Sequence, residues 1–198
     1  MQMQISNTKI EGVKLITLTP LADERGWFLK TFHAPTFAAA GLEINFPESF
    51  VSMSKRNVIR GMHFQTPPHD HAKIVRCVAG EVLDVVLDLR THSPTFKQAT
   101  GFVLNSDEPC AVYMPRGVAH GFLTLSDEAV LEYHTSTVHH PASDSGIRWD
   151  SFGFDWSLGD AMPTVSARDE RFGVLADFVS PFVCPSVSPV VSPSAAAN

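Results

Sequence analysis

Cysteine is scarce in this sequence. The 198 residues include three cysteines, Cys77, Cys110 and Cys184. They are too few and too scattered for a disulfide framework, and no two have the spacing of a zinc knuckle. This usage is typical of a reducing compartment, so we expect a cytoplasmic protein.

Long apolar runs and an excess of positive charge are missing as well. No run approaches the roughly 20 apolar residues that a membrane helix needs, and the N-terminal MQMQISNTKI lacks the basic and apolar regions of a secretion signal. Lys and Arg number 15 against 21 Asp and Glu, giving a net charge of −6 and a pI near 5.8. We therefore expect neither a membrane nor nucleic acid as a partner. A local basic pocket for a phosphorylated ligand remains compatible with this charge.

Signals for helices are also few. Short β-prone runs recur about every ten residues between turn residues, which favours an all-β sandwich or barrel. The exceptions are a Pro-started, alanine-rich segment at 34–41 and a weaker capped segment at 166–175. Two further strand predictions concern residues 10–18, expected to form part of a hairpin or edge pair, and the aromatic run 27–32, expected to enter the core.

The length and the 44% hydrophobic content predict one domain with a substantial core. We place this domain at residues 1–184. Residues 185–198 are rich in Ser, Pro and Ala and carry no charge, so we expect a flexible tail there.

The stretch 58–90 is the most informative part of the chain. It contains two β-type runs, 58–65 and 73–89, and the second run is interrupted at Ala79-Gly80. After this break, apolar residues occupy one face of the predicted strand, while Asp84 and Asp88 alternate with valines on the other. An isolated carboxylate is costly to bury, so this second face predicts a polar cavity.

Candidate site residues begin within the first of these runs. A glycine inside a strand often marks a bulge or a close backbone approach. Gly61 would therefore allow Arg60 and His63 to point into one pocket, although simple alternation places them on opposite faces. An ordinary strand with a buried, hydrogen-bonded histidine is the alternative.

Histidines cluster in the same region and suggest a second chemistry. His69, His71 and His120, completed by Glu81, would supply the donors of a mononuclear iron, manganese or zinc site. The alternatives are that His69 and His71 lie on the surface in the turn around Pro67-Pro68, or that they contact a ligand without a metal.

Taken together, the segments resemble the dTDP-4-dehydrorhamnose 3,5-epimerase family from about residue 10 to about residue 175. This resemblance implies a cupin-type jelly roll, a homodimer, no cofactor and no metal. It also implies a nucleoside-diphosphate 4-keto-6-deoxyhexose as substrate, whose C4 ketone acidifies the protons at C3 and C5. The segments that carry the resemblance are DERGWF (23–28), SKRNVIRGMHFQ (54–65), KIVRCVAGEVLDVVLDLR (73–90), SPTF (93–96), MPRGVAHGFLTLSD (114–127), EYHT (132–135), GIRWD (146–150) and VSARD (165–169).

By position, the resemblance gives catalytic roles to four residues. His63 matches the base, Asp169 the carboxylate that orients it, Lys73 the cation near the enolate oxygen, and Tyr133 the acid on the other ring face. Substrate binding falls to a larger set, among which Arg25 and Arg60 match the diphosphate-binding arginines. The set is Arg25, Phe28, Glu48, Phe50, Arg60, Gln65, His120, His139 and Arg168, with Asp84 as a partner for His120.

Four positions depart from the family pattern, and one of them, Lys30, replaces a glutamate and so reverses the local charge. Glu48 and Phe50 replace a glutamine and an asparagine that contact the nucleotide or sugar, so guanosine and cytidine conjugates stay open beside thymidine, the first choice. His139 replaces a second tyrosine, which leaves open whether C3, C5 or both are inverted. Two hypotheses compete with an epimerase: a non-catalytic sugar-nucleotide-binding protein and a metal-dependent cupin enzyme.

Overall fold

The computed structural model describes residues 3–184, and antiparallel β-structure dominates them. The predicted tail at 185–198 lies outside this range. A single α-helix occurs within it, α1 (Ala34–Ala39), and no helix in these residues is long and apolar enough to cross a membrane. The strands are β1 (Met3–Asn7), β2 (Lys14–Leu18), β3 (Leu21–Asp23), β4 (Gly26–Phe28), β5 (Glu48–Lys55), β6 (Ile59–Gln65), β7 (Lys73–Ala79), β8 (Glu81–Asp88), β9 (Ala99–Asn105), β10 (Cys110–Met114), β11 (Val118–Thr124), β12 (Glu128–Thr135) and β13 (Asp144–Gly146).

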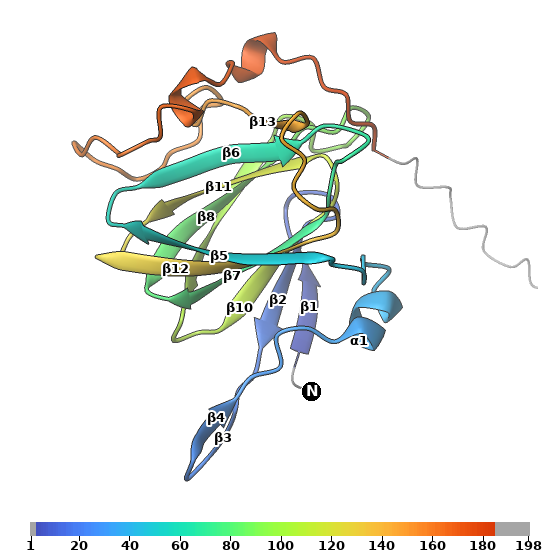
Figure 1. Ribbon diagram of the computed structural model, residues 1–198, viewed down its shortest axis with the longest axis vertical. Coiled ribbons are helices and arrows are strands. Elements are labelled where there is room, and N and C mark those ends of the chain that lie inside the picture. The colour runs from blue at the N-terminus through green and yellow to red at the C-terminus, as the bar shows by residue number, and fades with distance from the viewer. Residues whose placement is uncertain (1–2, 185–198) are drawn as a thin grey trace, which may run out of the picture.

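Two large sheets face each other, as Figure 1 shows. One has the strand order β1-β2-β10-β7-β12-β5 and the other has the order β13-β6-β11-β8-β9. Many neighbouring strands, such as β2 and β10 or β7 and β12, are far apart in the sequence, as in a jelly roll. The predicted all-β sandwich of the cupin type is confirmed.

The main core lies between the two sheets. It includes Val75 and Leu131 from the six-stranded sheet and Val82, Val86 and Phe122 from the five-stranded sheet, all at most 1% exposed. The alternation predicted for β8 explains this, because its even-numbered residues face the interior and its odd-numbered residues face outward. Asp84 and Asp88 are fully buried, and each has a polar partner: His120 contacts Oδ2 of Asp84, and Arg90, Ser93 and Thr95 contact Asp88.

Each sheet also has an outer apolar layer. Helix α1 and the segment 29–46 cover the β1-β2-β10 end of the six-stranded sheet, where Phe37 is fully buried. The segment 147–182 covers the outer face of the five-stranded sheet with Trp156, Leu175 and Phe182. This covering segment also brings residue 169 beneath β6.

Two predictions about elements need correction. The run 27–32 does not enter the core as a strand, because β4 pairs only with β3 in a two-stranded ribbon that projects from the sandwich, with Trp27 70% exposed. The segment 166–175 is not a regular helix. Ser166 accepts the N–H of Asp169 at 3.1 Å, but the helix is a single 3-10 turn, Asp169–Arg171, whose N-cap is Arg168. It ends there because the chain becomes extended at Phe172 and Gly173 then bridges to Ile147.

Candidate active site

A bulge in β6 organises the site. Opposite β11, the pairs His120–His63 and Phe122–Arg60 differ in spacing by one residue, so β6 contains an extra residue between Arg60 and His63. Gly61 permits this because its φ is +136° and a Cβ there would lie 2.4 Å from the Cα of Gly121. Arg60 and His63 therefore point to the same side, as the glycine suggested.

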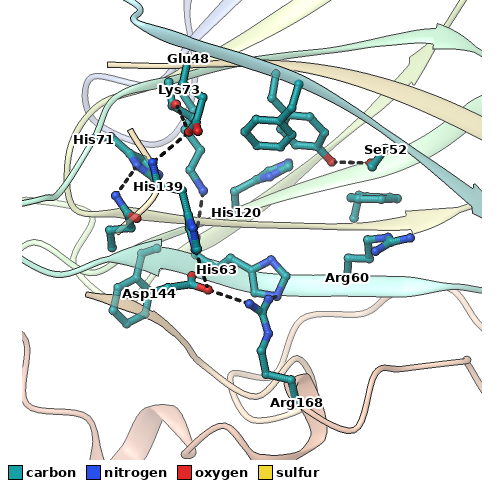
Figure 2. Close-up of a pocket in the computed structure, with 16 residues that line it drawn as sticks. Glu48, Ser52, Arg60, His63, His71, Lys73, His120, His139, Asp144 and Arg168 are labelled. Carbon is teal, nitrogen blue, oxygen red and sulfur yellow. Dashed lines mark hydrogen bonds and ion pairs between the residues drawn. The ribbon is translucent and has the colours of Figure 1, made fainter. Parts of the chain in front are cut away.

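The side to which they point holds a cavity of about 280 Å³ between the two sheets. In Figure 2, side chains of both sheets converge on it, among them His63 from β6, His120 from β11 and Lys73 from β7. The predicted site residues that line it are Glu48, Phe50, Arg60, His63, Gln65, Lys73, His120, Tyr133, His139 and Arg168.

Three predicted residues lie elsewhere. Asp169 lies behind His63, outside the lining but in contact with that ring. Arg25 and Phe28 lie on the β3–β4 ribbon, where Arg25 pairs with Asp23 and Phe28 is 59% exposed. Within one chain, these last two do not join the cavity.

His63 and Asp169 form a close pair. The Nε2 atom of His63 lies 2.8 Å from Oδ2 of Asp169, which is only 2% exposed and also accepts the N–H of Gly61 at 3.1 Å. Burial opposes the charged carboxylate, but these hydrogen bonds and the contact with Arg168 more than compensate, so the pKa of Asp169 lies well below its usual value. The carboxylate thus stays ionised and fixes the ring of His63.

Arg168 competes for the same ring nitrogen. Its Nη2 lies 2.8 Å from Nε2 of His63, while its Nη1 pairs with Asp144 at 2.7 Å (Figure 2). Nε2 carries either a proton or a lone pair and can serve only one of the two partners. We assign the proton to Nε2, donated to the buried carboxylate of Asp169, because the half-exposed Arg168 already has an acceptor in Asp144.

This assignment leaves Nδ1 of His63 as the free basic nitrogen. Burial lowers the pKa of His63 below its ordinary value of 6.5, with Lys73 and Arg168 acting in the same direction and Asp169 opposing them. The ring is therefore neutral near pH 7 and able to accept a proton.

Lys73 places a buried cation in the cavity. Its side chain is 8% exposed, and its Nζ donates to the carbonyl of His63 at 3.4 Å. Burial lowers its pKa to about 8, against the attraction of Asp144 and Asp84. Lys73 is thus largely protonated near pH 7, in a place where a fixed charge is poorly screened.

Tyr133 faces the cavity from the opposite sheet. Its ring is 7% exposed and its hydroxyl lies 3.2 Å from Oγ of Ser52. Burial raises the pKa of this phenol above its ordinary value, so it holds a proton throughout the neutral range. His63 on β6 and Tyr133 on β12 therefore form opposite walls of one cavity.

Further residues of the cavity have no counterpart in the sequence predictions. They are Ser52, Thr135 and Asp144, with Phe64 and Phe122 as apolar lining. Ser52 could have been predicted, because it lies two residues after Phe50 and therefore on the same face of the strand. Nothing local indicates Asp144, which depends on β13 pairing with β6.

The predicted partner of His120 is present. Its Nε2 lies 2.6 Å from Oδ2 of Asp84, and both side chains are buried. The pair spans two neighbouring strands, β11 and β8. His120 is therefore oriented by a carboxylate and presents its ring to the cavity.

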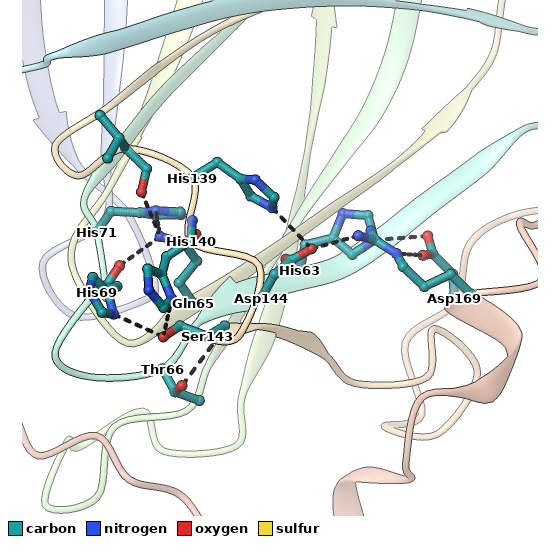
Figure 3. Close-up of polar contacts among 12 residues, drawn as sticks. His63, Gln65, Thr66, His69, His71, His139, His140, Ser143, Asp144 and Asp169 are labelled. Carbon is teal, nitrogen blue, oxygen red and sulfur yellow. Dashed lines mark hydrogen bonds and ion pairs between the residues drawn. The ribbon is translucent and has the colours of Figure 1, made fainter.

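The histidines that suggested a metal do not form a metal site in residues 3–184, where no three His, Cys, Asp or Glu side chains gather to hold an ion. His69 stacks on His140 with ring centroids 3.6 Å apart and contacts Ser143 (Figure 3). His71 instead lines the cavity, where Gln65 donates to its Nδ1 at 3.1 Å. It is not the surface residue that the turn suggested.

Comparison with known proteins agrees with this geometry. A family described as dTDP-4-dehydrorhamnose 3,5-epimerase matches residues 7–177. The chain is 40% identical to the dTDP-4-dehydrorhamnose 3,5-epimerase of Methanothermobacter thermautotrophicus, over 79% of this chain and 85% of that protein. It is 40% identical to the dTDP-4-dehydrorhamnose 3-epimerase of Streptomyces niveus, over 88% and 85%.

A solved structure supports the same relationship. The dTDP-6-deoxy-D-glucose-3,5-epimerase of Legionella pneumophila, in complex with dTDP-4-keto-L-rhamnose, superposes with a TM-score of 0.87 at 33% identity, covering 92% of this chain and all of that one. The family match over residues 7–177 includes strands of both sheets and Asp169. The chain belongs to the dTDP-4-dehydrorhamnose 3,5-epimerase family.

Proposed function

We propose that the protein epimerises a dTDP-linked 4-keto-6-deoxyhexose at C3, at C5 or at both, with dTDP-4-dehydro-6-deoxyglucose as the first-choice substrate. The observation that carries this proposal is the placement of a neutral imidazole and a protonated phenol on opposite walls of one cavity, with a buried ammonium beside them. A sugar ring between the walls would present one face to each group.

The chemistry follows from these positions. Nδ1 of His63 takes a proton from the carbon next to the C4 ketone, and the C–H electron pair becomes the enolate, whose oxygen lies near the charge of Lys73. The Tyr133 hydroxyl then gives its proton to the same carbon from the other face, which inverts the centre. The imidazolium loses its proton and the phenolate regains one through solvent, so the enzyme returns to its starting state without net consumption of any group.

The nucleotide end of the substrate would meet Arg60, whose guanidinium is held by Oγ of Ser54 at 2.8 Å and by the carbonyl of Met53. Such a fixed fork suits diphosphate oxygens. One carboxylate oxygen of Glu48 accepts the backbone N–H of His139 at 3.0 Å and the hydroxyl of Thr135 at 3.4 Å. These contacts give the Glu48 carboxylate a structural role within the cavity wall. A nucleotide base other than thymine is then not needed to account for this residue, which favours the thymidine conjugate.

A homodimer is part of the proposal. The β3–β4 ribbon projects from the sandwich and exposes Leu21, Trp27 and Phe28 by 53%, 70% and 59%. An isolated two-stranded ribbon is marginal in water, so it needs a surface to pack on. A second copy would supply that surface, and Arg25 and Phe28 would then reach the second copy's cavity.

The deciding experiment follows the substrate protons. The protein is incubated with dTDP-4-keto-6-deoxyglucose in deuterated water, and deuterium is located by NMR. Exchange at C3 or C5 is expected, and His63→Asn should slow it by about 10²–10⁴-fold, the usual contribution of a positioned base. Tight binding of the nucleotide sugar without any exchange would instead select a non-catalytic binding protein.

The number of centres that are inverted is a separate part of the proposal. Relatives described as 3,5-epimerases and as a 3-epimerase both match this chain. The products of the same incubation, analysed for configuration at C3 and C5, would distinguish the two outcomes.

A further inference from the structure

The strand at the edge of the six-stranded sheet contacts Tyr133 in two ways. Phe50 on β5 lies directly opposite Tyr133 on β12, and the two rings stack with centroids 4.7 Å apart and planes 14° apart. Ser52, two residues further on the same inner face, approaches the phenol oxygen at 3.2 Å. One edge strand therefore holds both the ring and the hydroxyl of the same side chain (Figure 2 shows Ser52).

His120 is a second aromatic neighbour of Tyr133, with ring centroids 6.0 Å apart and ring planes at 69°. The hydrogen bond to Asp84 fixes the orientation of His120. The Tyr133 ring therefore has a fixed imidazole and the phenyl ring of Phe50 as neighbours. Of these two neighbours, Phe50 is the one on an edge strand, 46% exposed and part of the cavity lining.

We infer that Phe50 is a positioning residue that confines the Tyr133 phenol to one orientation and thereby determines the ratio of inversion at C3 and C5. This rests on the proposed function. The two carbons flank the ketone on different sides, and enolisation toward either one needs a proton delivered to that carbon. A phenol held in one orientation reaches one carbon better than the other, whereas a phenol free to turn reaches both.

The test compares Phe50→Ala and Phe50→Leu with the unmodified protein in deuterated water. The measured quantities are the deuterium at C3 and at C5 and the configuration of each carbon. Phe50→Ala should move the C3 to C5 inversion ratio by about tenfold toward equality, and Ser52→Ala should move it in the same direction. Val51→Ala is the matched control, since Val51 is the next residue on β5, points away from the cavity and is 66% exposed.

The outcomes separate this inference from the proposed function. In one outcome, the unmodified protein exchanges deuterium and both Phe50 variants keep its C3 to C5 inversion ratio within about twofold. This result would overturn the role of Phe50 and leave the proposed epimerase activity intact. If the unmodified protein shows no exchange at either carbon, the proposed function fails and the inference with it. Should Phe50→Ala not fold, as judged by circular dichroism, Phe50→Leu decides, because it keeps apolar volume on β5 and removes the flat ring.

Discussion

At the scale of single residues, the site depends on which groups carry a proton near neutral pH. In the proposed mechanism, His63 must be neutral to act as the base, and burial lowers its pKa below 6.5. The same mechanism requires a charged Lys73 to stabilise the enolate, and burial lowers the pKa of Lys73 to about 8. A neutral His63 and a charged Lys73 therefore coexist between the lowered pKa of His63 and about pH 8.

This pairing predicts a bell-shaped pH dependence of kcat/KM. On the acid side, the rate should fall as His63 gains a proton, with the midpoint below pH 6.5. On the alkaline side, it should fall as Lys73 loses its proton, with the midpoint near pH 8. Initial rates of solvent exchange from pH 5 to pH 10 would check both limbs, and a rate that is flat from pH 7 to pH 10 would contradict the role of the Lys73 charge.

Removal of that charge provides a separate prediction. Lys73→Met should lower kcat by about 10²–10³-fold, the usual effect of losing one stabilising group at a developing oxyanion, and should abolish the alkaline limb. The control is Lys55→Met, which removes an exposed lysine at the end of β5. A Lys73→Met enzyme that keeps both its rate and the alkaline limb would show that another group titrates there.

His71 predicts an effect on stability. Burial lowers its pKa from 6.5 to about 2, so between these values the unfolded chain binds one more proton at this residue than the folded chain. The free energy of unfolding should therefore fall as pH decreases below about 6.5, by about 1.4 kcal/mol per pH unit from this group. His71→Gln should remove that part of the slope in urea titrations from pH 7 to pH 4.

The matched control for this experiment is His92→Gln, which removes an exposed histidine. If His71→Gln loses stability with acid as steeply as the unmodified protein, the burial of a neutral imidazole at position 71 is not a source of the acid sensitivity.

At the scale of elements, the bulge in β6 is the feature on which the site depends. Gly61 and Gly121 face each other across two strands, and a Cβ on Gly61 would lie 2.4 Å from the Cα of Gly121. Without the bulge, Arg60 and His63 would lie on opposite faces of the sheet. The glycine pair thus converts an ordinary strand into one that presents a guanidinium and an imidazole to the same cavity.

Substitution of this glycine tests its importance. Gly61→Ala should lower the free energy of unfolding by about 1–3 kcal/mol from the backbone conformation and by about 1–3 kcal/mol from the clash. It should also reduce activity, because His63 would shift. The control Gly153→Ala has a positive φ but nothing within 4 Å, so only a backbone cost of about 1–2 kcal/mol is expected. Equal losses of stability in the two variants would contradict the close approach.

The elements also show which features are predictable from the sequence. The strands β6 to β8 and the inward face of Asp84 follow from alternation, and the bulge follows from a glycine within a β-type run. The contact of Asp169 with His63 joins residues 106 positions apart, and neither side chain indicates it locally. Only the resemblance to a family predicts that pair, since local pattern alone leaves both residues unassigned.

The prediction for the β3–β4 ribbon is wrong for a different reason. Its aromatic run predicts a core strand because Trp and Phe usually enter a core, yet no other part of residues 3–184 covers Trp27. Composition indicates that such residues need burial, but it does not say which surface provides it. The placement of Arg25 in the proposed site therefore depends on how the chains assemble.

At the scale of the whole molecule, two inactive variants should complement each other if the ribbon of one copy serves the cavity of the other. Arg25→Ala keeps His63 but damages the ribbon, whereas His63→Asn keeps the ribbon but lacks the base. In an exchanged equal mixture, half of the dimers would contain both chains, and each would have one intact site, restoring about one quarter of the activity. Size-exclusion chromatography establishes the dimer, and exchange assays of the mixture measure the recovery. If instead each ribbon folded back onto its own cavity, every site would retain one defect and the mixture would stay as inactive as its components.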